Sequence, residues 1–105
     1  MKRMEPLPLK NVEMTDGLMR RMQRLVREQV VGYQWEVLND RVEGAAQSHA
    51  IENFRIAAGL AEGEYIGVIF RDSDLYKWLE ATAYCVEVFR DEQLEALADE
   101  ACRLI

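Results

Sequence analysis

The sequence has few of the residues that build metal centres and none of the glycine-rich motifs that hold phosphate. Among 105 residues there are two cysteines and one histidine, and Cys85 and Cys102 do not form a CxxC spacing. Because a structural zinc site needs about four Cys, His or carboxylate ligands, this composition is poor material for one. No P-loop or Gly-x-Gly-x-x-Gly stretch occurs, and no serine or cysteine nucleophile has a recognisable partner. Composition and spacing therefore supply no complete catalytic constellation.

Basic charge and long apolar runs are also scarce. The net charge of −6 argues against a nucleic-acid partner, since such affinity comes from basic side chains that neutralise phosphates. No stretch of eighteen uncharged apolar residues occurs, and residues 1–10 lack the apolar run of a signal peptide. We expect a cytoplasmic protein that binds neither nucleic acid nor membrane. The one basic cluster fits a solvated helix face, and its members are Arg20, Arg21, Arg24 and Arg27.

The two cysteines fall in helical patterns. In a reducing compartment both are expected to be free thiols. A Cys85–Cys102 disulfide would require that their helices be antiparallel neighbours, and it remains the less favoured alternative.

The composition indicates one folded domain, because half of the residues are hydrophobic and 30% are charged. Residues 1–14 include both prolines and predict an extended arm, whereas residues 15–105 predict a helical segment. The first helix is expected to begin near Gly17, with Thr15 or Asp16 as its cap. Gly32 weakens the last turns by roughly 1 kcal/mol relative to alanine, so the helix either continues or ends there. Its predicted buried stripe consists of Leu18, Met22, Leu25, Val26, Gln29, Val30 and Tyr33.

Three further helices are predicted. One opens at Ser48 and stops at Gly59, the next is capped by Asp72 or Ser73, and the last begins at Asp91, which is predicted to cap it. Residues 62–70 mix glycine with β-branched and aromatic residues, which favours an extended segment lying against another element. The third helix has an apolar arc of about half its circumference, more than an ordinary surface helix shows. The fourth ends on two apolar residues without a stop signal, so we expect a truncated chain whose helices were shaped to pack inside a larger assembly.

An acidic and aromatic cluster, RDSDLYKWLE, opens the third helix. Capping is the commonest role for Asp72 and Asp74 at such a position. In a second interpretation they line a sugar pocket. The carboxylates would accept hydrogen bonds from the sugar hydroxyls, and the rings of Tyr76 and Trp78 would cover the C–H side of the sugar. In a third interpretation the two carboxylates act as the catalytic pair of a glycosidase. This requires that they lie about 5–5.5 Å apart for retention of configuration or 6.5–9.5 Å apart for inversion.

Two further residues have a structural and a functional interpretation. His49, the only imidazole, stands in the first turn of the second predicted helix, where a structural or solvent-facing role is commoner than catalysis. Trp35 is a candidate pocket wall, but its helical spacing favours the core.

Three stretches, YQWEVLND, SHAIENFRIAAG and GVIFRDSDLYKWLEATAY, resemble the N-terminal part of the β-L-arabinofuranosidase-like proteins of glycoside hydrolase family 127. The resemblance implies an all-α fold, an (α/α)6 toroid in which helical hairpins form an inner and an outer ring around a pocket. This chain would supply about the first two hairpins of that toroid.

The resemblance also implies retaining hydrolysis of L-arabinofuranosides by a cysteine nucleophile held on zinc, with a glutamate as acid/base. Those family motifs are expected beyond Ile105, and Cys85 and Cys102 do not match them. The chain is therefore expected to hold no catalytic residue or metal ligand and to be inactive alone. The residues predicted for the pocket mouth or its support are His49, Asp72, Asp74, Tyr76 and Trp78.

The favoured function is that of an N-terminal fragment of such a hydrolase, whose partner is the rest of the hydrolase chain. One alternative is a small helical interaction module without catalysis, which self-associates through exposed apolar helix faces. Another is a small autonomous enzyme using Asp72 and Asp74, which predicts turnover of an aryl arabinofuranoside.

Overall fold

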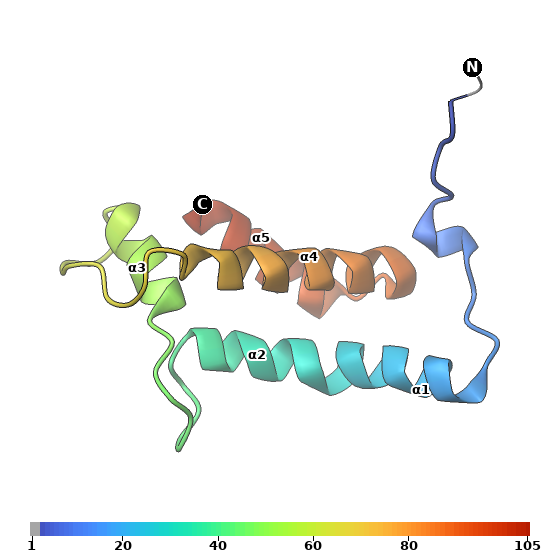
Figure 1. Cartoon of the computed structure of the whole chain (residues 1–105), viewed down its shortest axis with the longest axis horizontal. Helices are drawn as coiled ribbons and strands as arrows, with labels where there is room; N and C mark the ends of the chain where they lie inside the picture. Colours follow the sequence, from blue (N-terminus) through green and yellow to red (C-terminus); the bar gives the residue numbers. More distant parts are fainter. Residues whose placement is uncertain (1–2) are drawn as a thin grey trace.

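A computed structural model describes residues 3–105, and every regular element in that range is helical. The all-α prediction is therefore confirmed. A short 3-10 turn at Leu9–Asn11 interrupts the otherwise irregular residues 3–16. The α-helices, shown in Figure 1, are α1 (Gly17–Leu25), α2 (Val31–Leu38), α3 (Ala50–Ala57), α4 (Asp72–Phe89) and α5 (Glu92–Leu104).

The first two helices are one continuous rod, because α1 passes into α2 through a wider π-helical turn at Val26–Val30. In this turn the Val31 N–H donates to the Val26 carbonyl, the i→i+5 bond of a π-bulge. Asp16 caps the rod by accepting the N–H groups of Leu18 at 2.8 Å and Met19 at 2.9 Å, as predicted. Gly32 does not end the helix.

The core lies on α4, which packs against α2, α3 and α5. The rings of Trp35 and Trp78 are 4.5 Å apart between centroids, and the Trp78 indole donates to the Val31 carbonyl at 2.9 Å. Leu75 and Thr82 are fully buried beside them. Trp35 is thus a core residue, as its helical spacing suggested.

The rod buries the face opposite to the predicted stripe. On its inner side Arg27, Val31 and Trp35 recur every four residues, and Val31 and Trp35 are buried. The predicted stripe points away from α4, since α4 meets the side that carries Trp35. Its large side chains, apart from half-buried Val30, are 38–56% exposed: Leu18, Met22, Leu25, Val26 and Tyr33.

A two-residue connection joins α4 to α5. Arg90 ends α4 in the left-handed conformation, with φ 53°. Asp91 caps α5, because its carboxylate accepts hydrogen bonds from the backbone N–H groups of Gln93 and Leu94. The Asp91 carboxylate also accepts from Arg27 Nε at 2.9 Å, and Arg27 lies over the Phe89 ring. Arg27 therefore fixes the rod to the α4–α5 connection.

Two predicted helix starts need correction. The helix predicted to open at Ser48, α3, begins instead at Ala50, because His49 is left-handed, with φ 55°, and Asp40 accepts its backbone N–H. The next helix, α4, begins at Asp72, but neither Asp72 nor Ser73 caps it. Arg71 is the N-cap and makes no side-chain capping bond, because a backbone turn at 68–71 leads directly into the helix.

Residues 58–71 form an irregular loop between α3 and α4 rather than a regular extended strand. The Asn53 side chain holds the loop by bonding both the N–H and the carbonyl of Ile66. Several large apolar side chains of the loop are nevertheless exposed, namely Leu60, Tyr65, Ile66, Val68, Ile69 and Phe70.

The molecule is more open than its length requires. Its accessible surface is 8145 Å², whereas a folded monomer of this mass has about 6,100 Å². Its radius of gyration is 16.3 Å, against about 13 Å for a compact domain of this length. Within residues 3–105, no helix combines the length and apolar character that crossing a bilayer requires.

Candidate functional site

A groove with a volume of about 530 Å³ runs between α2 and α4. It brings together two of the predicted sugar-binding residues, Asp74 and Trp78, which lie one turn apart on the same face of α4. The groove is lined by Tyr33, Gln34, Val37, Leu38, Asp74, Lys77, Trp78 and Ala81.

The polar groups lie at the edge of this groove and the apolar ones at its base. Trp78 is only 3% exposed, and its N–H is already bonded to Val31, so it offers an apolar surface and no free donor. Asp74 is half-buried, whereas Tyr33 is 56% exposed. A carboxylate, an amide and a phenol beside an apolar base suit a ligand with hydroxyl groups on one side and C–H groups on the other.

Asp72 and Tyr76 lie elsewhere, against α3. Asp72 borders a small apolar cavity of about 130 Å³ that also contacts Phe54 and Tyr65. The Tyr76 ring meets Phe54 edge-on, with 5.7 Å between centroids. Asp72 and Asp74 therefore open onto different depressions.

His49 belongs to a third depression, of about 280 Å³, at the end of α2. Its Nδ1 is 3.7 Å from Asp40 Oδ2, and its backbone N–H donates to the same carboxylate. Asp40 also accepts from the Ser48 N–H, so it organises this whole turn. Sequence reasoning missed Asp40 as an organiser, and the only signal was the Asn39–Asp40 turn pair.

The five predicted residues thus occupy three places rather than one. Asp74 and Trp78 share the α2–α4 groove, Asp72 and Tyr76 face α3, and His49 lies beyond α2. Within this chain they do not converge on a single ligand.

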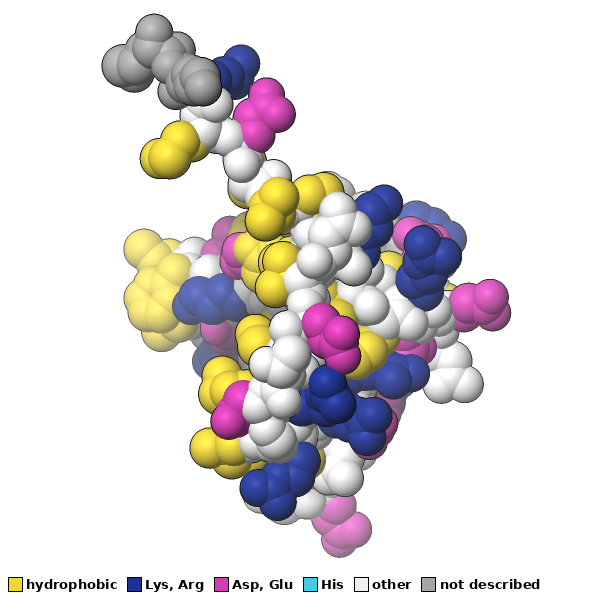
Figure 2. Space-filling model, turned by 90° about the vertical axis from the view of Figure 1, so that its right-hand side faces the viewer, with side chains coloured by type: hydrophobic (Ala, Val, Ile, Leu, Met, Phe, Trp, Pro, Cys, Tyr) yellow, Lys and Arg dark blue, Asp and Glu magenta, His cyan; other side chains and the backbone are white. Residues whose placement is uncertain are grey.

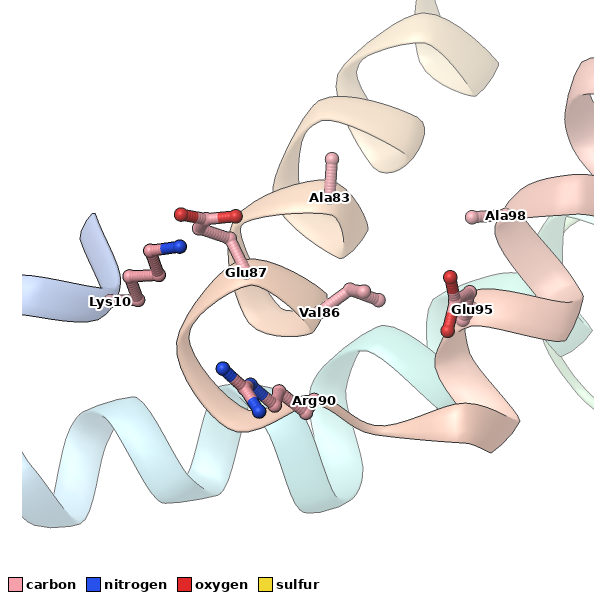
Figure 3. Close-up of a pocket in the computed structure, with 7 residues that line it drawn as sticks. All are labelled: Lys10, Ala83, Val86, Glu87, Arg90, Glu95 and Ala98. Carbon is pink, nitrogen blue, oxygen red and sulfur yellow. The ribbon is translucent and has the colours of Figure 1, made fainter. Parts of the chain in front are cut away.

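A further depression, of about 310 Å³, lies where the N-terminal arm meets α4 and α5. Figure 3 shows Lys10 and Glu87 pointing toward one another, while Val86 points toward the helix that carries Glu95 and Ala98. Arg90 and Glu95 bring further charges of both signs. This mixture gives no convergent set of groups for catalysis.

The cysteines do not form an activated or metal-binding pair. Cys85 is buried, Cys102 is exposed and both are free. Burial raises the pKa of the Cys85 thiol, with an opposing effect of Arg27, so the thiol stays protonated near neutrality. Across residues 3–105, no three His, Cys, Asp or Glu side chains are grouped so that they could hold a metal ion. The donor set of this segment does not fit zinc.

Comparison with known proteins identifies the family. The model of the β-L-arabinofuranosidase GH127 catalytic domain matches residues 11–105. The chain belongs to glycoside hydrolase family 127. The resemblance stated from the sequence is thereby confirmed.

Two GH127 relatives show how much of the family the chain represents. It is 36% identical over 107 residues to the non-reducing end β-L-arabinofuranosidase of Bifidobacterium longum subsp. longum. The alignment covers 90% of this chain and 16% of that protein. A crystal structure of a GH127 β-L-arabinofuranosidase from Geobacillus stearothermophilus T6 is 54% identical, with a TM-score of 0.85, over 90% of this chain and 15% of that one.

The chain therefore spans about 15% of the GH127 proteins it matches, and it corresponds to their N-terminal region. The Geobacillus structure has an α/α toroid fold, so these helices are one part of such a toroid.

Proposed function

We propose that this chain forms the first helical hairpins of an L-arabinofuranoside hydrolase and contributes to the rim of its sugar pocket. The observation that carries this proposal is the combination of 54% identity with a TM-score of 0.85 over 90% of the chain. The helices are thus arranged as in a protein named as a β-L-arabinofuranosidase. The expected partner is the rest of a hydrolase chain.

The exposed surface supports a scaffold role. The surface exceeds that of a compact monomer of this mass by about 2,000 Å², and it includes apolar side chains of α1 and of the 58–71 loop. Large exposed apolar side chains that cluster on one surface mark an interaction site more often than those scattered singly. Burial against further helices of a toroid would remove this surface from water.

Within this scaffold, the α2–α4 groove is the part we assign to the sugar. Asp74 would accept hydrogen bonds from hydroxyls, and the Gln34 amide would donate and accept beside it. The exposed Tyr33 ring would cover the C–H side of the sugar. Asp72, Tyr76 and His49 would support the groove by holding α3 and its flanking turns.

The bond-breaking chemistry would lie outside these residues. The resemblance implies a zinc-held cysteine nucleophile and a glutamate acid/base, but the donors of this chain do not fit zinc. Cys85 is a buried, protonated thiol rather than a nucleophile. We therefore expect no hydrolysis by this chain alone.

A chimera tests the proposal. The matching N-terminal segment of the Geobacillus enzyme is replaced by this chain, and hydrolysis of an aryl β-L-arabinofuranoside is measured for the chimera, the Geobacillus enzyme and the isolated chain. We expect turnover by the first two and none by the third. In the chimera, Asp74→Asn should raise KM about tenfold, which corresponds to about 1.4 kcal/mol of lost binding.

Glu80→Gln is the matched control, because Glu80 is an exposed carboxylate on α4 outside the groove. A folded chimera without activity would contradict the assignment of this chain to the hydrolase scaffold. Equal KM values for the Asp74 and Glu80 variants would contradict the proposal that the groove binds the sugar. Turnover by the isolated chain would favour the small-enzyme alternative.

Self-association is the second candidate, and the exposed apolar side chains of α1 are the observation that favours it. Light scattering during size-exclusion chromatography decides between the two. A monomer across micromolar concentrations would count against an interaction module, whereas a stable dimer would support it.

A further inference from the structure

The outer face of α1 carries an apolar surface that no other described element covers. No residue of α1 is buried, and Figure 1 shows the helix at the edge of the molecule. Leu18, Met22 and Leu25 lie at spacings of four and three, with exposures of 54%, 47% and 39%. They form one stripe on the side away from α4.

Charged side chains border this stripe. An open depression of about 550 Å³ on the same face is lined by Arg21, Met22, Arg24, Leu25, Glu28 and Gln29. Figure 2 shows basic side chains gathered beside apolar ones on the side of the molecule seen from its α1 end. We call the residues that line this depression, together with Leu18, the α1 outer face.

Two of the arginines on this face have no acidic partner among residues 3–105. The neighbouring Arg20 is paired with Glu13 at 2.9 Å, and Arg27 is paired with Asp91 at 2.9 Å. By contrast, Arg21 and Arg24 form no ion pair within the described part of the chain. With only Glu28 to offset them, they make the face basic, although the whole chain has a charge of −6.

We propose that the α1 outer face is a docking surface for an amphipathic helix with carboxylates beside its apolar stripe, and that the rest of the GH127 hydrolase supplies this helix. The proposal rests on the proposed function. The apolar stripe would bury against Leu18, Met22 and Leu25, while the carboxylates would pair with Arg21 and Arg24. Such charge complementarity fixes the register of a helix pair as well as its partner.

The chain exposes more surface than a compact monomer of its mass would. A stable interface removes about 800 Å² from each partner, and the surface in excess of a compact monomer is about 2,000 Å². Part of that excess comes from the N-terminal arm and the 58–71 loop, which are exposed as well. The share that belongs to α1 is apolar at Leu18, Met22 and Leu25.

A second copy of the chain fits this face less well. A dimer through α1 would bring together two copies each of Arg21 and Arg24 but only two of Glu28, so two of the four arginines would have no acidic partner at this face. The exposed side of α5 offers carboxylates such as Glu92, Glu95 and Asp99 but no large apolar side chain between them. Neither surface provides both the charge and the apolar stripe.

Methionine oxidation tests the proposal with an internal control. The isolated chain and the chimera described above are treated with hydrogen peroxide, and the oxidation rates of Met22 and Met4 are followed by peptide mass spectrometry. Met4 is 96% exposed and lies outside the matched residues 11–105. We expect Met22 to be oxidised about tenfold more slowly in the chimera than in the isolated chain, because oxidation follows exposure, and Met4 to be unchanged.

A charge-reversal pair tests the occupant's chemistry. In the chimera, Arg21→Glu combined with Arg24→Glu should restore fast oxidation of Met22, whereas Arg41→Glu should not, since Arg41 lies in the α2–α3 loop. Equal Met22 rates in the isolated chain and in an active chimera would overturn the docking surface and leave the proposed function standing. Met22 protection in an inactive chimera would support the surface and count against the proposed function. Protection in the isolated chain that increases with concentration would identify a second copy and overturn the proposal.

Discussion

The apolar side chains around α4 are buried, whereas those on α1 are exposed. Around α4, the side chains of Trp35, Leu75 and Trp78 are at most 3% exposed. On α1, by contrast, every large apolar residue is at least 39% exposed, although the spacing of these residues is just as regular. An amphipathic pattern therefore shows that a helix needs a neighbour, but it does not show that this neighbour is in the same segment.

One ion pair connects the two regions. Arg27 lies in the π-helical turn at the end of α1, and Asp91 caps α5. Their bond of 2.9 Å, together with the Phe89 ring below Arg27, holds the rod against the α4–α5 connection. Beyond this point toward the N-terminus, α1 has no packing contact with the core helices that compares with it.

The largest expected effect comes from removing a core ring. Trp78→Ala should lower the free energy of unfolding by about 3–5 kcal/mol, because it leaves a cavity beside Trp35. Met22→Ala, on exposed α1, should change it by less than about 0.5 kcal/mol. Urea unfolding followed by circular dichroism measures both.

Because a small domain has a stability of only about 5–15 kcal/mol, the Trp78→Ala protein is at risk of not folding. Trp78→Phe keeps most of the ring volume and should be less destabilising while still losing the bond to Val31. Comparable losses for the Met22 and Trp78 variants would show that α1 is part of the core and would remove the contrast between the two regions.

The next effect concerns the connection between the regions. Asp91→Ala should cost about 1–2 kcal/mol, because it removes the cap of α5 together with the partner of Arg27. A double-mutant cycle with Arg27→Ala should give a coupling energy of about 0.5–1 kcal/mol, since the two side chains are in direct contact. Asp16→Ala is the matched control, as it removes the cap of the uncovered α1. Asp16→Ala should speed amide exchange in α1 without changing the free energy of global unfolding. Additive effects of the Asp91 and Arg27 substitutions would contradict an energetic coupling between these two side chains.

The same carboxylate predicts a pH dependence. Hydrogen bonds from the Leu94 N–H and from Arg27 lower the pKa of Asp91 in the folded protein. Its contribution to stability is therefore present above the unfolded pKa of about 3.9 and is lost as pH falls through the lower, folded value. Urea midpoints measured from pH 6 to pH 2 should fall less steeply for Asp91→Asn, which retains a capping side chain but does not titrate. If the urea midpoints of the two proteins fell in parallel as the pH is lowered, Asp91 would not be the group responsible for this pH dependence.

Much of the local structure could be predicted because it depends on short-range chemistry. The cap of the first helix was predicted as Thr15 or Asp16 and that of the last as Asp91, and the caps observed are Asp16 and Asp91. The Trp35 core position also followed from spacing. In contrast, nothing local shows that the rod turns the Trp35 side, rather than the Met22 side, toward α4, because this choice depends on which partners are present.

The candidate site was harder to predict for a related reason. Asp72, Asp74, Tyr76 and Trp78 are close in sequence, but the turns of α4 direct Asp74 and Trp78 toward α2 and Tyr76 toward Phe54. The left-handed turn at His49 is held by its backbone N–H, which donates to the carboxylate of Asp40, nine residues earlier. A sequence cluster therefore does not become a spatial cluster when its members point to different sides of one helix.

The smallest expected effect in the isolated chain bears most directly on the contrast between the regions. Leu25→Gln lies on the α1 outer face, where the leucine is 39% exposed, so its free energy of unfolding should change by less than about 0.5 kcal/mol. In the chimera with the Geobacillus enzyme, the same substitution should cost about 1–3 kcal/mol, because a polar amide would then be buried without a partner. Thermal melts of both proteins, with Arg41→Gln as the exposed control in each, measure the difference. If the cost is the same in both settings, Leu25 faces water in the larger protein too, and the apolar stripe of α1 has no occupant there.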